Sequence, residues 1–155
     1  IDPGLANTCF GIISKSKDKL LPITHGCIHT DTKNSFAKRL KDISEEVKTL
    51  IIKHRPAVVA IEDVFFFKNI SSALKVGQAK GAIIAACNFL NVHVEEYTPL
   101  QIKLAVSGYG KADKGQIQQM VKMLLRMSHI PKPSHCADAL ACAICCAHSN
   151  KYNFK

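Results

Sequence analysis

The pattern of hydrophobic and polar residues predicts strands at the start of the chain. Residues 8–14 and 20–30 are largely apolar and are separated by the charged residues 15–19, which favours a hairpin. An apolar residue followed by Asp2 and two turn-forming residues predicts that another strand ends at Asp2. Such a strand needs residues before Ile1, so we expect the chain to lack the first few residues of the native protein. Three strands with short links predict an antiparallel meander.

The pattern then changes to the helical period of about 3.6 residues. Residues 35–54 carry one apolar stripe, and this helix is expected to end before Pro56, because the residue before a proline disfavours the helical conformation. The following residues, 57–63, form a continuous apolar run that stops at Glu62 and Asp63. A short run of this kind is typical of a central parallel strand covered by helices on both faces.

Residues 71–89 predict a helix that is unusually rich in small side chains. Gly77 and Gly81 lie four residues apart on one face, where another backbone can come close despite the cost of glycine in a helix. Packing on the sheet and a dimer interface explain this face equally well. Residues 92–97 alternate as a strand does.

Three more helices are predicted in the second half of the chain by their N-terminal caps. Thr98 precedes a proline and is expected to cap a helix over residues 99–106. Asp113 caps the next helix, and Ser134 is expected to cap a last helix over residues 135–148. The order of strands and helices therefore predicts one α/β domain with a mixed sheet over the whole chain.

The length and charge of the chain limit the classes of function. A chain of 155 residues can bury a core without metal or disulfide staples. Its 21 basic and 12 acidic residues give a net charge of +9, which favours an anionic partner such as nucleic acid or an acidic membrane surface. A soluble basic protein without such a partner is the alternative. No apolar run reaches about 18 residues and no signal peptide opens the chain, so we expect a cytoplasmic protein without a membrane span.

The seven cysteines are odd in number and lie mostly in apolar segments, as buried free thiols do. This favours a reducing cytosol over a disulfide framework. Cys142 and Cys145 have a CxxC spacing, but no second ligand pair follows at the spacing of a zinc finger. We therefore do not expect a zinc site there.

Four residues could form an acidic metal site. Asp2 and Glu62 end strands that could be neighbours, and His135 and Asp138 lie three apart in the first turn of the last helix. Converging carboxylates that leave coordination positions open are what Mg²⁺ or Mn²⁺ prefers. Two such ions about 4 Å apart can activate water and stabilise the leaving oxygen of a phosphodiester.

Each candidate also has a simpler interpretation. Asp2 could merely begin a turn, Glu62 could be a solvated strand end, and His135 and Asp138 could be polar residues of a first helical turn. The same holds for the basic and aromatic candidates. Phenylalanines at 65–67 are more often core residues, and single lysines such as Lys103 and Lys114 are ordinary surface cations.

Joint occurrence of motifs favours the functional interpretation. Ile-Asp-Pro-Gly at 1–4, Ala-Ile-Glu at 60–62, Gly-Gln-Ala-Lys-Gly at 77–81, Gln-Ile-Lys at 101–103 and Ala-Asp-Ala-Leu-Ala at 137–141 follow one another along the chain. Together with Val64-Phe65, Lys68-Asn69 and Ser-Ala-Leu-Lys at 72–75, they closely resemble the RuvC-type Holliday junction resolvases. The resemblance covers essentially the whole chain.

The resemblance implies an RNase H-like fold with a mixed five-stranded sheet and helices on both faces. It also implies a homodimer that nicks two symmetric strands of a four-way DNA junction in recombination and repair, with Mg²⁺ as cofactor, two ions per site, and a branch-migration helicase complex as partner. Mn²⁺ is the alternative ion.

The resemblance also assigns roles to single residues. Asp2, Glu62 and Asp138 would be metal-binding carboxylates, and His135 stands where many members have Asp and some have His. A neutral imidazole also binds metal, but the change could shift the preference toward Mn²⁺. The remaining implied roles are base stacking by Phe65, phosphate contacts by Lys103 and Lys114, further DNA contacts by Lys68 and Lys111, and a dimer interface at Gly77 and Gly81.

Two other functions are compatible with parts of the sequence. The His135 departure would suit a module that binds junctions without cleaving them. An Asp-x-Gly after a strand also occurs in phosphotransferases of the actin or sugar-kinase type, but one domain without a second phosphate loop is too short for their two-domain clamp.

Overall fold

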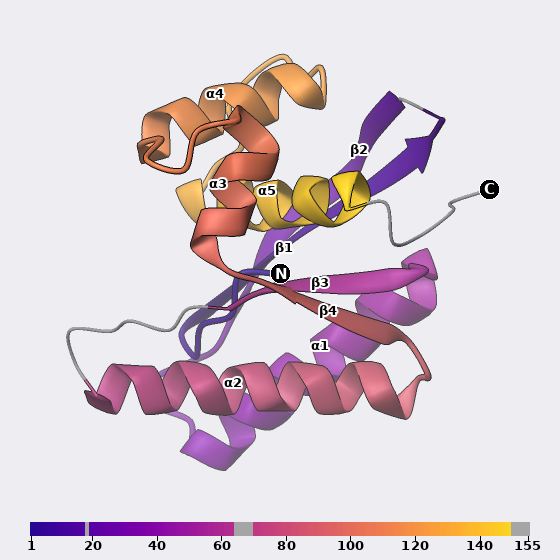
Figure 1. The fold of residues 1–155 in the computed structure, drawn as a ribbon. Coiled ribbons are helices and arrows are strands. Elements are labelled where there is room, and N and C mark those ends of the chain that lie inside the picture. Colours follow the sequence, from indigo (N-terminus) through magenta and orange to yellow (C-terminus); the bar gives the residue numbers. More distant parts are fainter. Residues whose placement is uncertain (18, 64–69, 150–155) are drawn as a thin grey trace.

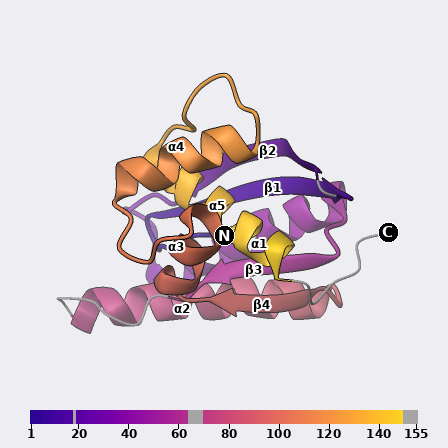
Figure 2. The same ribbon diagram turned by 45° about the horizontal axis from the view of Figure 1, so that its top comes forward.

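The computed structural model describes residues 1–17, 19–63 and 70–149. Its elements follow one another as β1 (Asn7–Ser16), β2 (Lys19–His29), α1 (Phe36–His54), β3 (Val58–Glu62), α2 (Ile70–Phe89), β4 (His93–Tyr97), α3 (Pro99–Ser107), α4 (Lys114–Leu124) and α5 (Ser134–His148). Helices α1 and α2 lie on one side of the strands and α3, α4 and α5 on the other (Figures 1 and 2). The predicted α/β class, with helices on both faces, is confirmed.

Side chains that alternate along β3 explain why helices cover both faces. Val59 and Ile61 are buried in a core with α1 and α2, and Ala60, between them, is buried in a second core with α3, α4 and α5. Because successive side chains of a strand point to opposite faces, a strand that is apolar at every position needs a helical layer on each side. Glu62 ends this strand at the border of both layers.

Strand pairing differs from the expected sheet of five strands. Among the described residues, β1 pairs with β2 in antiparallel register and β3 pairs with β4 in parallel register. Ile1 and Asp2 lie between the two pairs and hydrogen-bond to both, Asp2 to Cys9 of β1 and Ile1 to Ala60 of β3. Two residues are too few for a strand ladder, so the position expected for the fifth strand holds only this bridge.

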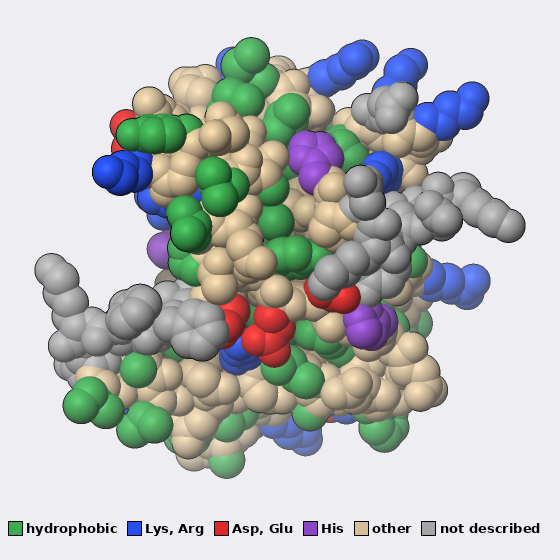
Figure 3. All heavy atoms as spheres, in the orientation of Figure 1, with side chains coloured by type: hydrophobic (Ala, Val, Ile, Leu, Met, Phe, Trp, Pro, Cys, Tyr) green, Lys and Arg blue, Asp and Glu red, His purple; other side chains and the backbone are tan. Residues whose placement is uncertain are grey.

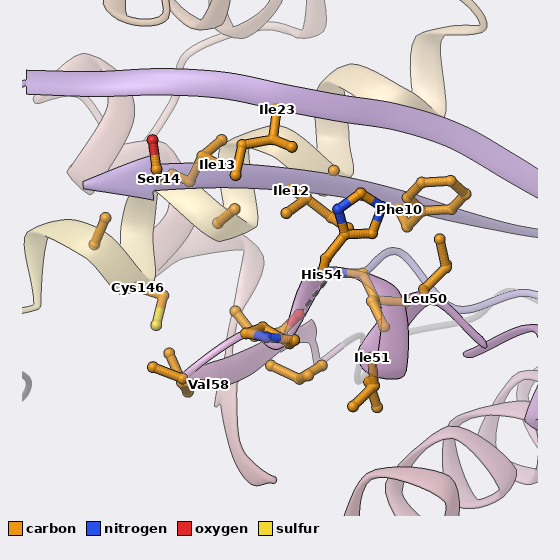
Figure 4. A pocket seen from close by; sticks show the side chains of 18 of the residues that line it. Phe10, Ile12, Ile13, Ser14, Ile23, Leu50, Ile51, His54, Val58 and Cys146 are labelled. Carbon is orange, nitrogen blue, oxygen red and sulfur yellow. Dashed lines mark hydrogen bonds between the residues drawn. The ribbon is translucent and has the colours of Figure 1, made fainter. Parts of the chain in front are cut away.

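A cavity of about 300 Å³ continues the gap between β1 and β3 beyond Ile1. Apolar side chains from both strand pairs and from α1 line it, among them Ile12, Ile23, Leu50 and Val58 (Figure 4). Strand β1 has a ladder partner along one edge only, as does β3, within the part of the chain that the structure describes. The gap therefore separates two strand edges over most of their length.

Local sequence signals set most helix ends as predicted. The side chain of Ser35 caps α1, and Arg55, with a left-handed backbone (φ 47°), ends it before Pro56. Thr98 and Asp113 each form a reciprocal capping box with the residue three positions on.

The prediction that Ser134 caps the last helix is wrong. Pro133 occupies the N-cap position, Ser134 is the first residue of α5, and no side chain caps this end. The amide of Cys136 donates to the carbonyl of Pro133. The helix thus begins one residue earlier than the sequence indicated, because the extended backbone of Pro133 already supplies the cap conformation.

The expectation that all cysteines are free is wrong for two of them. Cys9 and Cys27 form a disulfide, because they stand directly opposite each other in the β1–β2 register. Cross-strand partners in an antiparallel pair bring their Cβ atoms within about 5 Å. The five other cysteines are buried free thiols, as predicted.

No helix among residues 1–17, 19–63 and 70–149 is long and apolar enough to cross a membrane.

Ile61 should be a sensitive test of the layered core, because it is fully buried one residue before Glu62. We expect Ile61→Ala to lower the free energy of unfolding by about 2–5 kcal/mol through lost burial and a residual cavity. Urea denaturation followed by circular dichroism measures this. The matched control is Ile52→Ala, at a position of α1 that is 63% exposed, and equal losses in both variants would contradict the assigned core.

Candidate active site

Backbone pairing brings two acidic side chains to one edge of the strands. Asp2 and Cys9 exchange two backbone hydrogen bonds of 2.9 and 3.0 Å, and the amide of Glu62 donates to the carbonyl of Ile1 at 2.9 Å. The amino group of Ile1 donates to the carbonyl of Ala60 at 2.6 Å. Asp2 and Glu62 are therefore held on neighbouring segments at the carboxyl end of β3.

Helix α5 brings a histidine and a third carboxylate to the same place. His135 and Asp138 lie three apart in its first turn, and Nδ1 of His135 is 2.9 Å from Oδ2 of Asp2 and 3.5 Å from Oδ2 of Asp138. The possible ligand atoms of Asp2, His135 and Asp138 all lie within 4.8 Å of one another. Residues 133 positions apart in sequence thus meet in one cluster.

A cavity of about 320 Å³ contains this cluster. Its lining comprises the four candidate ligands, two lysines and several apolar residues: Asp2, Glu62, His135, Asp138, Lys103, Lys114, Pro99, Ile102, Ile117 and Ala141. Nζ of Lys114, from the first turn of α4, donates to Oδ2 of Asp138 at 2.7 Å. The cavity therefore combines converging carboxylates with two cations, the arrangement that the sequence led us to expect.

The apolar lining residues were not singled out as site residues from the sequence. Ile102 and Ile117 belong to the buried faces of α3 and α4, and each lies within one helical turn of a lysine that lines the cavity. Ile117 lies three positions after Lys114, and this spacing on one helix face is the signal that could have identified it. Ile102 directly precedes Lys103 and has no such signal.

Other predicted site residues lie elsewhere. Lys111 is exposed in the loop before α4 and does not line the cavity. Phe65 and Lys68 lie outside the described residues.

Gly77 and Gly81, the predicted interface residues, are exposed on α2. Apart from the adjacent residues and the nearby backbone of α2 itself, no described heavy atom lies within 4 Å of a Cβ built on either glycine. Of the two explanations left open for these glycines, packing on the sheet is therefore wrong.

Asp63, next to Glu62, forms an ion pair outside the acidic cavity. Its carboxylate accepts from Nζ of Lys80 in α2 at 2.5 Å, and the same ammonium group is 2.5 Å from a carboxylate oxygen of Glu96 in β4. This ion pair network accounts for Asp63, which consequently does not line the acidic cavity.

Burial makes the acidic cluster electrostatically unfavourable without cations. Burial raises the pKa of Glu62 to about 7, with further contributions from the charges of Asp2 and Asp138. Burial also raises the pKa of Asp2, against the opposing effect of its hydrogen bond to His135. Carboxylates that resist ionisation in each other's presence are stabilised when a cation joins them.

The donor set suits a hard divalent cation. Oxygen atoms of three carboxylates and one imidazole nitrogen face a single cavity that is open to solvent, and such ligands are typical of Mg²⁺ and Mn²⁺. Among the described residues, the only other cluster of this kind consists of Cys9, Cys27 and Cys136. Cys142 and Cys145 belong to neither cluster.

Replacing Glu62 by Gln should stabilise the metal-free protein at alkaline pH. In the unfolded chain the Glu62 carboxyl ionises near its ordinary pKa of 4.5, whereas in the folded protein it ionises only near pH 7. The loss of folding stability caused by Glu62 therefore grows from about pH 4.5 to about pH 7 and is constant at higher pH. Each kcal/mol of penalty removed raises Tm by about 2–4 °C in a chain of this size.

Thermal unfolding in chelator at pH 8 and pH 5 measures this effect. We expect Glu62→Gln to gain Tm at pH 8 and to gain less at pH 5, while Glu46→Gln, at an exposed position of α1, changes little at either pH. A loss of Tm at pH 8 would contradict the electrostatic account.

Curated relatives resemble the chain over nearly its full length. The crossover junction endodeoxyribonuclease RuvC of Heliobacterium modesticaldum is 46% identical over 149 residues, which cover 96% of this chain and 92% of that protein. The enzyme of the same name from Thermosipho melanesiensis is 44% identical over 152 residues, which cover 98% of this chain and 97% of that protein.

A solved structure has the same fold. Thermus thermophilus RuvC in complex with a Holliday junction substrate superposes with a TM-score of 0.90 at 34% identity, over 95% of this chain and 90% of that one. The family model described as crossover junction endodeoxyribonuclease RuvC matches residues 1–146. The match spans the strand bridge at Asp2, the end of β3 and the first turn of α5, and the chain therefore belongs to the RuvC family.

Proposed function

We propose that this chain is a crossover junction endodeoxyribonuclease, which nicks two symmetric strands of four-way DNA junctions by metal-dependent phosphodiester hydrolysis in recombination and repair. One observation carries the proposal: three carboxylates, one imidazole and two lysines share a single cavity in a member of the RuvC family. The nuclease unit is the domain of residues 1–155.

Asp2, Glu62, His135 and Asp138 hold Mg²⁺, with two ions per site and Mn²⁺ as the alternative ion. Bound there, the ions would activate water and stabilise the charge that develops on the leaving oxygen. The carboxylate ligands must be ionised to bind metal. The raised pKa of Glu62 therefore predicts that metal binding weakens as pH falls below about 7. The imidazole of His135 is a softer ligand than a carboxylate and favours Mn²⁺ more than Asp would.

Positive charge holds the DNA. Lys103 and Lys114 line the acidic cavity and would contact the phosphates beside the scissile bond. The hydrogen bond of Lys114 to Asp138 keeps its ammonium group at the cavity, where a phosphate can take over as partner. Lys68 and Lys111 add DNA contacts and Phe65 stacks on an unpaired base, which is worth about 1–3 kcal/mol per base in other proteins.

The partners follow from the substrate. A four-way junction with two symmetric nicks calls for a homodimer, because a twofold interface matches the symmetry of the substrate. A branch-migration helicase as a further partner rests on the family resemblance alone. Work on DNA in the cytoplasm is proposed from the predominance of free cysteines.

The exposed side of α2 supports the dimer. Ile70 is 79% exposed, Leu74 is 63% exposed and Phe89 is 75% exposed, and the first two lie at helical spacing with the exposed Gly77 and Gly81. Figure 3 shows hydrophobic side chains on the surface over this helix. Small residues between larger apolar ones allow two helices to approach closely, so this side of α2 is suited to a second copy of the chain.

A non-catalytic junction-binding module is the second candidate. It is favoured by one observation: Nδ1 of His135 is hydrogen-bonded to Asp2 at a place where a further carboxylate would complete an all-oxygen site. Such a module would bind junctions and leave them intact in both metals.

Glu62→Gln should separate the two candidates. We expect it to lower nicking of a synthetic four-way junction at least about a hundredfold while junction binding is kept, because even the hydrogen-bond partners of metal ligands cost 10–100-fold when removed. Denaturing gels of labelled strands measure nicking, and gel shifts in chelator measure binding.

The controls are Glu46→Gln and a linear duplex of the same sequence. Paired nicks in the junction only, in Mg²⁺ or Mn²⁺ and lost in chelator, are the expected result for wild type and for Glu46→Gln. Nicking by Glu62→Gln at the wild-type rate would refute the assigned roles. Binding without nicks by wild-type protein in either metal would establish the binding module instead.

A charge placed on the exposed side of α2 should weaken the dimer. Gly81→Glu puts a carboxylate where two copies of α2 would meet, so light scattering should show dissociation at protein concentrations that keep the wild type dimeric. Gln119→Glu, on the exposed side of α4, is the control with an equal change of charge. A dimer as stable in Gly81→Glu as in the control would rule out this interface.

A further inference from the structure

Three sulfur atoms lie together on segments that also carry residues of the acidic cluster. Cys9 of β1 and Cys27 of β2 form the disulfide, and Sγ of Cys136, in the first turn of α5, is 3.6 Å from Sγ of Cys27. All three sulfurs lie within 4.8 Å of one another. A thiol this close to a disulfide is within reach of thiol–disulfide exchange once it turns into line with the S–S bond, because exchange proceeds by attack of a thiolate on one of the two bonded sulfurs.

Two of these cysteines are tied to the acidic cluster. Cys9 is the residue that exchanges both backbone hydrogen bonds with Asp2. Cys136 stands between His135 and Asp138 on the same helical turn, and its side chain is fully buried. A change of disulfide partner therefore acts on the segments that carry the candidate metal ligands.

We propose that Cys9, Cys27 and Cys136 form a redox site in which the disulfide moves from Cys9–Cys27 to Cys27–Cys136, and that the second pairing slows nicking. In this step Cys136 loses its thiol proton and its sulfur bonds to Sγ of Cys27. The Cys9–Cys27 bond breaks, its electron pair stays on Sγ of Cys9, and that sulfur takes up a proton. The exchange consumes no oxidant, since one disulfide replaces another.

The expected effect on the site follows from distances. A disulfide bond is about 2.0 Å long, so joining Cys27 to Cys136 shortens their 3.6 Å separation by about 1.6 Å. The first turn of α5, with His135 and Asp138, would be drawn toward β2 and away from its present fit to Asp2. Catalytic groups need positions held within about 0.5 Å, and a misplacement of 1 Å can cost about a hundredfold in rate.

Access to the three sulfurs differs. Cys9 and Cys136 are 1% and 0% exposed, whereas Cys27 is partly exposed and is the sulfur that both disulfides share. A soluble dithiol would therefore attack the disulfide at Cys27, and in the reduced protein the Cys27 thiolate would attack glutathione disulfide and release reduced glutathione. A thiol of a buried neighbour would then displace the mixed disulfide and complete the reaction within the protein. Uncatalysed rearrangement of disulfides takes minutes to hours, so the pairing would persist over many catalytic turnovers.

Disulfide mapping tests the exchange independently of activity. Wild type, Cys9→Ala and Cys136→Ala are equilibrated with reduced and oxidised glutathione, alkylated and digested, and the linked peptides are identified by mass spectrometry. Cys9→Ala can form only the Cys27–Cys136 bond within this trio, and Cys136→Ala only the Cys9–Cys27 bond. We expect the Cys27–Cys136 peptide in oxidised Cys9→Ala and, as a smaller share, in wild type.

The same samples are then assayed for nicking, a readout that rests on the proposed function. Oxidised Cys9→Ala should nick junctions at least about tenfold more slowly than its reduced form, with full recovery in dithiothreitol, while Cys136→Ala should change less than about twofold between the two conditions. Thermal unfolding confirms that each variant is folded. Disulfide mapping of the wild type decides whether the exchange occurs, even if Cys9→Ala does not fold.

Two results would overturn the proposal. One is the absence of a Cys27–Cys136 peptide from equilibrated wild type, or from oxidised Cys9→Ala that is folded. The other is that Cys9→Ala with the Cys27–Cys136 disulfide nicks junctions at the same rate as reduced Cys9→Ala. Failure of reduced wild-type protein to nick would instead refute the proposed function, and the mapping would still decide whether the exchange occurs.

Discussion

The acidic site depends on the backbone pairing of Ile1 and Asp2 between two pairs of strands. Asp2 is bonded to Cys9 on one side, and Ile1 is bonded to Ala60 and Glu62 on the other. This pairing sets the carboxylate of Asp2 beside that of Glu62, and it joins the strand pairs into one layer with a core on each face. The same few backbone hydrogen bonds thus hold the strand pairs together and position the acidic side chains.

Electrostatics in the cavity oppose folding and serve function. Carboxylates that are buried together raise one another's pKa, and the neighbouring His135 and Lys114 offset only part of their charge. Negative charge that the protein leaves unbalanced can be balanced by divalent cations. Such a cluster lowers the stability of the metal-free protein, and a cation that binds there restores stability.

Helix α5 has two chemically different sides in its first turn. His135 and Asp138 face the acidic cavity, while Cys136 packs against the disulfide partner Cys27. The same turn therefore carries residues of both the acidic cluster and the sulfur cluster. Helix α2 lies on the other side of the strands (Figure 1), where its two glycines are exposed.

Local features were determined by the sequence, because they depend on residues about four positions apart. Helical periodicity predicted α1, and a run rich in small residues predicted α2. The capping residues Thr98 and Asp113 predicted α3 and α4, and a continuous apolar run predicted β3. The N-cap of α5 is Pro133 and not Ser134, so local sequence signals placed this helix end only to within one residue.

Contacts between distant segments were decided by the tertiary structure. Family motifs indicated that Asp2 and His135 act together, but the hydrogen bond between them, across 133 positions, depends on where α5 packs. The disulfide of Cys9 depends on strand register, and the approach of Cys27 to Cys136 on how α5 lies against β2. Periodicity determines which face of a segment is buried, whereas register and packing determine what that face meets.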